Sequence, residues 1–166
     1  MNARKPLPLA KIRLLILDID GVLTDGRLYF GNKGEALKVF HVRDGHGIKL
    51  LMTAGVPVAA MSGRRSAAAA ARLRELRVPV IQGCADKLAA LHKLTRRLGI
   101  DPRHCACIVD DTPDLPLMSA VGLAAAVADA HPIVLSAAHW VARLGGGAGA
   151  VRELCDAILR ARAGRA

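Results

Sequence analysis

Short apolar runs and amphipathic stretches alternate along the chain, and this pattern predicts strands that alternate with helices. Residues 12–18 and 56–61 are nearly continuous apolar runs, which is typical of parallel strands buried on both faces. Residues 86–98 place leucines at helical spacing instead, and the segment ends at Gly99, a residue type that often terminates helices. The other expected helices cover residues 45–54, 66–76, 115–120 and 151–162, and the other expected strands cover residues 78–81, 105–109, 122–127 and 140–143.

Residues 27–42 interrupt this alternation, because two extended segments (RLYF and ALKVFHV) flank the turn-forming sequence GNKGE and so predict a β-hairpin flap. The rest of the pattern predicts an α/β fold, a three-layer α/β/α sandwich around a parallel central sheet. We assign residues 1–11 to a basic arm, residues 12–144 to the core and residues 145–166 to a glycine-rich tail with a terminal helix. The glycine run of the tail is expected to be a flexible hinge.

Composition narrows the possible partners. The chain has 166 residues, a net charge of +10 and a pI of about 10.2, which favours anionic partners. Aromatic residues make up only 2% and no helical stripe of basic residues accompanies the charge, so we expect no nucleic-acid partner. The four cysteines form no CxxC pair and are expected to be reduced core thiols. Without an apolar signal segment or a membrane-length apolar run, the protein is expected to be cytoplasmic and to have no membrane partner.

The strongest chemical feature is the sequence LLILDIDGVLTDG, in which Asp18 and Asp20 directly follow the first buried strand. Strand ends line the ligand site of open α/β sheets, so Asp18 can attack a phosphorus atom and Asp20 can act as general acid and base. Carboxylates this close repel each other, so we expect a divalent cation, and Mg²⁺ prefers oxygen ligands. Taken alone, the DxD pattern also fits a simple turn, or a glycosyltransferase that holds a metal-bound nucleotide sugar.

Two further segments supply groups that suit a phosphate. Ser62, Gly63 and Arg64 follow the second buried strand and offer a hydroxyl, a backbone N–H and a guanidinium. The alternative is that they cap the next helix. Lys87 lies near a helix start, where the helix dipole disfavours a cation, so we expect it to neutralise a phosphate and Asp18. A solvated surface lysine is the alternative for this residue.

Three more carboxylates gather in the sequence CIVDDTPDLP, at the end of another predicted strand. Asp110 is expected to complete the metal site with Asp18 and the backbone carbonyl of Asp20. Asp111 and Asp114 are expected to orient the metal ligands or the lysine from a second layer. The alternative is a polar loop that caps a helix.

Taken in order, these four segments resemble the haloacid dehalogenase superfamily of phosphotransferases over nearly the whole chain. The resemblance implies a Rossmann-like fold and an aspartyl-phosphate intermediate on Asp18. It implies these further roles: acid and base for Asp20, phosphate binding for Ser62 and Lys87, and metal binding for Asp110. The intervals between the four segments leave no room for a cap domain, so the site is either open or closed by another subunit.

The segments FHVRDGHGIKLL, DDTPDLP, AVADAHP and GGGAGAVRELCDAIL closely resemble one capless branch of the superfamily. Its members dephosphorylate 3-deoxy-D-manno-octulosonate 8-phosphate, an anionic sugar phosphate used in lipopolysaccharide synthesis. The resemblance implies a homotetramer in which the hairpin and the C-terminal tail cross subunit interfaces. It also implies that substrate is bound by His41, Val42, Arg43, Asp44, Gly45, Lys49, Arg64 and Arg72. From the residues alone, His41 also fits a structural histidine, Arg43 a solvated strand residue and Arg72 an exposed helix residue.

The chain departs from this branch at Val109, where the family usually has a glycine before the paired aspartates. Valine restricts the backbone, so a position that required a glycine-only conformation would displace Asp110 and weaken metal binding. Three other functions stay open: a phosphatase for a related nonulosonate 9-phosphate, a catalytically silent domain for assembly or binding, and, on charge alone, a nucleic-acid-binding protein whose affinity falls steeply with salt.

Overall fold

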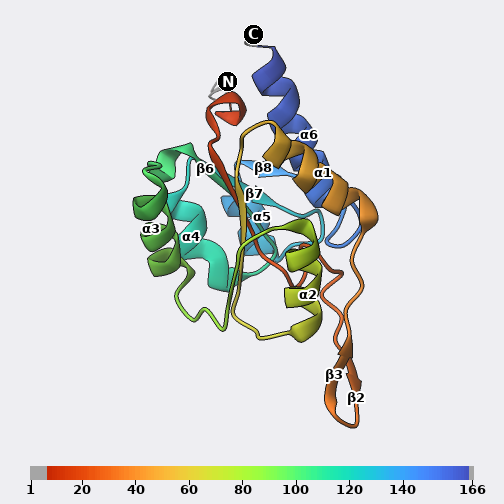
Figure 1. Ribbon diagram of the computed structural model, residues 1–166. Coiled ribbons are helices and arrows are strands. Elements are labelled where there is room, and N and C mark those ends of the chain that lie inside the picture. The colour runs from red at the N-terminus through yellow and green to blue at the C-terminus, as the bar shows by residue number, and fades with distance from the viewer. Residues whose placement is uncertain (1–6, 165–166) are drawn as a thin grey trace.

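The structure, a computed structural model, describes residues 7–164 and places a parallel sheet between two layers of helices (Figure 1). Six strands form the sheet in the order β5-β4-β1-β6-β7-β8, and all neighbours are parallel. The chain winds outward from β1 in both directions, which confirms the predicted fold class. The strands are β1 (Leu14–Leu17), β4 (Val58–Ser62), β5 (Val80–Gln82), β6 (Cys105–Val109), β7 (Leu123–Ala126) and β8 (Trp140–Val141).

Two groups of three helices cover the sheet, since α1 packs against α2 and α6 while α4 packs against α3 and α5. The helices are α1 (Val42–Thr53), α2 (Ala67–Leu76), α3 (Lys87–Leu98), α4 (Leu115–Ala120), α5 (Pro132–Ala137) and α6 (Ala150–Ala163), with 3-10 turns η1 (Leu9–Lys11), η2 (Pro102–His104) and η3 (Thr112–Asp114). The sequence pattern missed α5, a six-residue helix that buries only Val134 and so has no clear periodicity.

The central strands β1, β4 and β6 are buried along their whole length, as their continuous apolar sequences predict. Burial of each leucine or isoleucine of β1 contributes roughly 1.5–3 kcal/mol. The packed strands therefore fix the backbone position of the residues that follow them, Asp18 after β1 and Asp110 after β6. The two strands are neighbours at the point where the chain changes winding direction. Both aspartates thus lie where doubly wound sheets bind their ligands.

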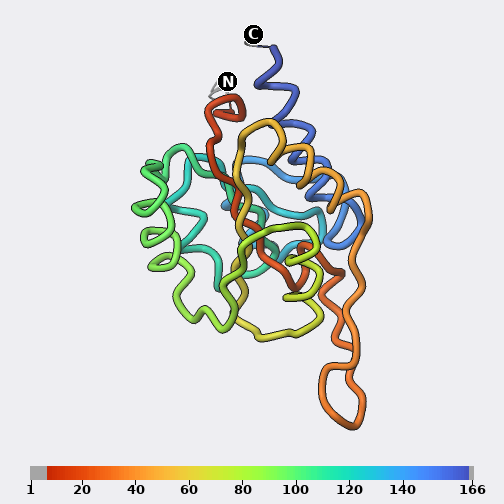
Figure 2. The backbone as a smooth tube through the Cα atoms, in the orientation of Figure 1, coloured from red at the N-terminus to blue at the C-terminus, as the bar shows by residue number. Residues whose placement is uncertain are grey.

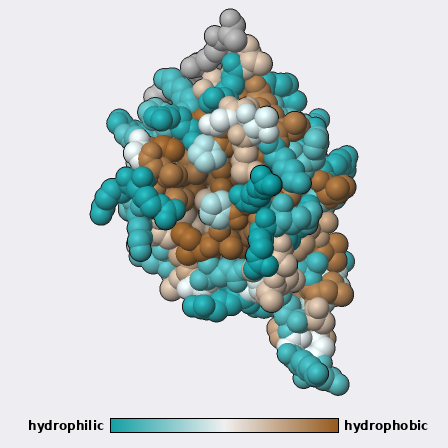
Figure 3. Space-filling view, viewed as in Figure 1, coloured by the Kyte–Doolittle hydropathy of each residue, from teal (hydrophilic) through white to brown (hydrophobic). Residues whose placement is uncertain are grey.

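The predicted hairpin is present as the antiparallel pair β2 (Tyr29–Gly31) and β3 (Gly34–Leu37), which projects from the body (Figure 2). Apolar surface gathers on the part of the hairpin nearest the body, whereas its tip is hydrophilic (Figure 3). The expected second strand is too long, because the chain ends β3 at Leu37 and enters α1 at Val42. His41 caps α1 by accepting a hydrogen bond from the backbone N–H of Arg43, so Arg43 is a helical residue and the strand alternative is wrong.

The C-terminal segment packs onto the core. Helix α6 lies along α1 and η1 (Figure 1). Asp44 of α1 is 1% exposed, and its Oδ1 accepts a hydrogen bond from the backbone N–H of Arg152 at 2.8 Å, so it caps α6 from outside. In the preceding glycine run, the backbone N–H of Gly147 donates to the carbonyl of Val22 at 2.9 Å. The division of the chain at residue 145 stays a prediction.

The N-terminal arm is described only from residue 7, and residues 1–6 lie outside the described part of the chain, as do residues 165–166. None of the helices described is both long enough and apolar enough to span a bilayer. All four cysteines are free. Three of them are buried as predicted, but Cys84 is half-buried and lines the cleft described below, so its assignment to the core is wrong.

Candidate active site

A cleft of about 440 Å³ opens at the carboxyl ends of β1, β4 and β6. It brings together nine of the predicted site residues from four separate stretches of the chain. These residues are Asp18, Asp20, Ser62, Gly63, Arg64, Lys87, Asp110, Asp111 and Asp114. The parallel strands explain this convergence, because their carboxyl ends meet at one edge of the sheet.

Lys87 holds two carboxylates at the floor of the cleft. Its Nζ donates to Oδ1 of Asp18 at 2.8 Å and to Oδ2 of Asp114 at 2.8 Å. Burial disfavours the ammonium, but the two carboxylates outweigh this effect, so the pKa of Lys87 is raised. The surface alternative for Lys87 is wrong, since its side chain is 10% exposed. Lys87 therefore fixes the direction of the Asp18 carboxylate and leaves a positive charge beside it.

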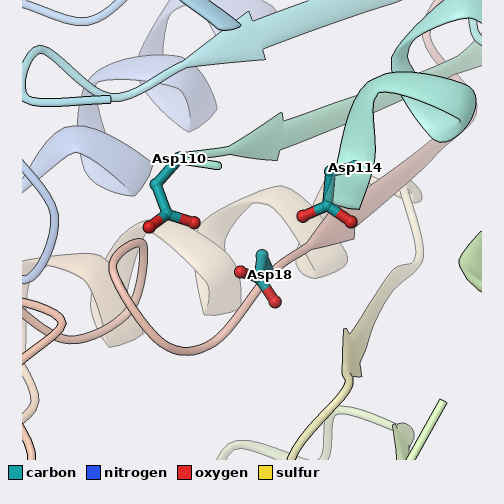
Figure 4. A group of neighbouring side chains, drawn as sticks. All are labelled: Asp18, Asp110 and Asp114. Carbon is teal, nitrogen blue, oxygen red and sulfur yellow. The ribbon is translucent and has the colours of Figure 1, made fainter. Parts of the chain in front are cut away.

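The carboxylates of Asp18, Asp110 and Asp114 face one another across the cleft floor, with one oxygen of each within 4.8 Å of the others (Figure 4). Burial, followed by the charge of Asp18, raises the pKa of Asp110 to about 8. Burial and Asp18 likewise raise the pKa of Asp114 to about 6. Such excess negative charge, offered by oxygen atoms alone, fits a hard divalent cation. Asp111 instead accepts a hydrogen bond from the backbone N–H of Thr112 at 2.7 Å and caps η3.

Asp20 points to the opposite wall of the cleft. Its Oδ2 accepts a hydrogen bond from the Ser62 hydroxyl at 3.2 Å, and its Oδ1 is paired with Nζ of Lys38. Ser62 also accepts a hydrogen bond from the backbone N–H of Arg64 at 3.1 Å. The helix that follows is capped by Ser66, not by Ser62, so the capping alternative is wrong for Ser62. Ser62 therefore orients Asp20, and its role in phosphate binding stays a prediction.

Sequence reasoning missed two residues of this wall, Glu35 and Lys38, which the hairpin strand β3 and the residue just beyond it carry into the site. No motif marked them, because a charged pair at one end of a hairpin is an ordinary surface pattern. Only the tertiary structure shows that the side chain of Lys38 lies against Asp20 and is 2% exposed.

Val109 occupies an ordinary strand position in β6, paired with Ala126 of β7. Among the described residues, Arg77 is the one non-glycine residue with a positive φ, so Val109 needs no glycine-only conformation. The close approach that does require glycine is at Gly21, with φ +86°, where an added Cβ would overlap the carboxylate of Asp110. Valine therefore leaves the Asp110 carboxylate beside Asp18.

The remaining predicted substrate contacts lie outside the cleft of this chain. They are His41, Val42, Arg43, Asp44, Gly45, Lys49 and Arg72. The buried Asp44 caps α6, which does not fit direct contact with a substrate. Arg72 pairs with Glu75 at 2.9 Å, and Lys49 lines a separate surface hollow. A role in substrate binding for this group stays a prediction.

The arrangement suits attack on a phosphate monoester. Asp18 offers a carboxylate fixed by Lys87, Asp20 offers a second carboxylate on the facing wall, and Arg64 offers an exposed guanidinium at the rim. A nucleophile, a proton carrier and cations around one cleft are the components of covalent phosphoryl transfer.

Comparison with known proteins agrees with this chemistry. Residues 74–145 match the family of haloacid dehalogenase-like hydrolases. The 3-deoxy-D-manno-octulosonate 8-phosphate phosphatase KdsC of Yersinia pestis is 51% identical over 154 residues, which are 92% of this chain and 82% of that protein. The cobalt-bound deoxy-D-mannose-octulosonate 8-phosphate phosphatase YrbI of Haemophilus influenzae superposes with a TM-score of 0.91 at 44% identity, covering 93% of this chain and 91% of that one. The Moraxella catarrhalis enzyme, solved with magnesium, phosphate and KDO, superposes with a TM-score of 0.90 at 38% identity, covering 93% of this chain and 90% of that one.

Proposed function

Since this chain belongs to the haloacid dehalogenase-like hydrolases, in the family of the 3-deoxy-D-manno-octulosonate 8-phosphate phosphatases, we propose that it hydrolyses that sugar phosphate to the free sugar acid and inorganic phosphate. The observation that carries this proposal is the pairing of Asp18 with Lys87 in a cleft that also holds Asp20 and Asp110. We also propose that the product serves lipopolysaccharide precursor synthesis.

The reaction takes place in two steps on the chain's own residues. An oxygen of Asp18 attacks phosphorus, the bond from phosphorus to the sugar oxygen breaks, and Asp20 gives a proton to the departing oxygen. Asp20 then takes a proton from water, which attacks the aspartyl phosphate and restores the Asp18 carboxylate. In this proposal, the cations Lys87 and Arg64 offset the negative charge of the phosphoryl oxygens, and Ser62 offers a polar group beside them.

Mg²⁺ is the proposed cofactor, held by Asp18, Asp110 and the backbone carbonyl of Asp20, with Asp114 and Asp111 orienting these groups. When bound, the ion supplies positive charge that offsets the carboxylates and the phosphate. The raised pKa of Asp110 supports this assignment, because a cation would relieve the repulsion that causes part of it. The magnesium in the M. catarrhalis enzyme and the cobalt in the H. influenzae enzyme support it as well.

The same family membership supports a homotetramer as the proposed assembly. In such a tetramer, the exposed apolar side chains of the hairpin, including Phe30 and Leu37, would be covered. Residues of the neighbouring α1, such as Arg43, could then reach an anionic sugar. The cytoplasmic location expected from the sequence stays a prediction.

Phosphate release from 3-deoxy-D-manno-octulosonate 8-phosphate tests the function, measured with Mg²⁺ and with chelator for the native chain and Asp18→Asn. We expect release that requires both the metal and Asp18. A nonulosonate 9-phosphate measured in parallel ranks the substrates. Rapid release from that compound alone would shift the substrate, and release that survives Asp18→Asn would contradict the aspartyl-phosphate mechanism.

A further inference from the structure

The hairpin contributes a buried cation to the catalytic wall. Lys38 directly follows β3, and its side chain is only 2% exposed. Its Nζ is paired with Oδ1 of Asp20 and lies 3.2 Å from Oε2 of Glu35. A buried ammonium is tolerated only when carboxylates compensate for its lost hydration, and here two of them do so.

Glu35 ties this cation to the rigid part of the fold. One of its carboxylate oxygens accepts a hydrogen bond from the hydroxyl of Ser66, and the other lies 3.8 Å from Nη2 of Arg64. Ser66 is itself fixed, because it caps α2 and its backbone N–H donates to Oε1 of Gln82 at 2.7 Å. The projecting hairpin is therefore attached to α2 and β5 at the point where Lys38 meets Asp20.

Both oxygens of Asp20 are thereby held, one by Lys38 and the other by Ser62. Proton transfer requires the donor to lie within hydrogen-bonding reach of the departing oxygen, and small misplacements cost large factors in rate. Ser62 alone leaves the carboxylate free to rotate about this single hydrogen bond. Lys38 removes that freedom, because it holds the other carboxylate oxygen of Asp20.

We propose that Lys38 is a positioning residue for Asp20, held in place by Glu35. This inference rests on the proposed phosphatase function, because it assigns Lys38 a part in both proton transfers of that reaction. Lys38 acts through Asp20 and is not assigned a contact with the substrate. The hairpin then has a role within its own subunit.

Two substrates separate this role from a merely structural one. The sugar phosphate needs a proton on its departing oxygen, whereas 4-nitrophenyl phosphate releases a phenolate that is stable as an anion. With the aryl substrate, the first step therefore needs no proton from Asp20, and only the second step, in which Asp20 activates water, depends on this residue. Lys38→Met should release about one equivalent of nitrophenolate rapidly and then turn over roughly 10- to 100-fold more slowly than the native chain. Sugar-phosphate turnover should fall by at least the same factor, mainly in kcat.

Lys38→Arg keeps a cation and should recover part of the lost turnover. Lys33→Met is the matched control, since it removes an exposed lysine from the turn of the same hairpin. It should leave the turnover of both substrates unchanged. Glu35→Gln keeps an acceptor for Ser66 but removes the charge that holds Lys38, so it should show a weaker form of the same behaviour. This variant also provides the test if Lys38→Met fails to fold.

Native turnover of both substrates by Lys38→Met would overturn the proposal. An equal decrease in its burst and steady-state rates would also overturn it, since that result indicates general damage to the site. A native chain that releases no phosphate from either substrate, or that loses nothing on Asp18→Asn, would instead contradict the proposed function and remove the basis for a role of Lys38. The native chain and Asp18→Asn thus distinguish a failure of the proposed function from a failure of the role of Lys38.

Discussion

Replacing Asp110 by asparagine should make the metal-free protein more stable while it abolishes metal-dependent activity. In the native chain, the carboxylates of Asp18, Asp110 and Asp114 lie together, and the single positive charge of Lys87 pairs only with the first and the last. Asparagine keeps the size of Asp110 and removes its charge. A residue that destabilises the free fold and is needed for a ligand is a common feature of functional sites.

The magnitude follows from the geometry. Oxygens of Asp18 and Asp110 lie within 4.8 Å of each other. At an effective dielectric constant of about 20, two ionised groups at that separation repel by about 3 kcal/mol. Relaxation of the side chains reduces this figure, so we expect Asp110→Asn to stabilise the metal-free protein by about 2 kcal/mol at pH 8.5. For a chain of this size, that gain raises Tm by roughly 4–8 °C.

The stability of the metal-free protein should depend on pH through Asp110. The pKa of Asp110 is about 8 in the folded protein, against 3.8 for a free aspartate, so the folded state holds the proton more tightly than the unfolded state. Stability of the metal-free native chain should therefore fall as the pH rises from about 4 to about 8. Asp110→Asn should reduce this slope, and the gain in Tm should shrink toward pH 5. In Asp110→Asn, Asp114, with a pKa of about 6, should still make stability fall as the pH rises from about 4 to about 6.

Thermal unfolding in chelator, at several pH values, measures these changes, and a second series with Mg²⁺ measures the metal. Metal at 100 times its Kd should stabilise the native chain by about 2.7 kcal/mol and Asp110→Asn by much less. Asp101→Asn is the control, because the exposed Asp101 pairs with Arg103 and its loss should give no gain in stability. A metal-free Asp110→Asn protein that is no more stable than the native chain at pH 8.5 would refute the reasoning. A native-sized response to Mg²⁺ would refute the assignment of Asp110 as a ligand.

Two further substitutions test the packing around the site. Asp44→Ala should lower the free energy of unfolding by about 2 kcal/mol, because the backbone N–H of Arg152 loses its buried acceptor; denaturant unfolding measures this change, and an unaffected midpoint would show that Asp44 does not cap α6. Gly146→Ala should cost roughly 2 kcal/mol or more, because its Cβ would overlap the carbonyl oxygen of Gly21 in the catalytic loop, whereas Gly31→Ala meets only ordinary contacts. Equal thermal stability of these two glycine variants would contradict this packing.

Much of the site could be predicted because its chemistry follows strands that are visible in the sequence. Asp18 and Asp110 each follow a buried apolar strand, and parallel strands bring their carboxyl ends to one edge of the sheet. Lys87 violated the helix dipole preference, which marked it before its partners were known. The convergence of these residues was therefore expected from local patterns together with one rule about sheets.

The segment HVRDG shows the limit of that reasoning. The family resemblance implied ligand contacts for this segment, yet within one chain His41 caps α1 and Asp44 caps α6. The glycine run of the C-terminal segment suggested a hinge, but Gly147 is hydrogen-bonded to the loop after β1. Composition and spacing do not distinguish an aspartate that binds a ligand from one that caps a distant helix, because both need only a hydrogen-bond donor nearby.

The sequence by itself determined the alternation of elements, the parallel sheet and the strand-end carboxylates, because each depends on periodicity within a few neighbouring residues. Tertiary structure alone decided that Lys38 meets Asp20, 18 positions away, and that Asp44 meets Arg152, 108 positions away. It also decided that Val109 needs no glycine-only conformation and that Gly21 does, since backbone conformation and close approach depend on the path of the whole chain. Contacts between distant segments form only when the packed core fixes where each segment lies, and no local pattern encodes that position.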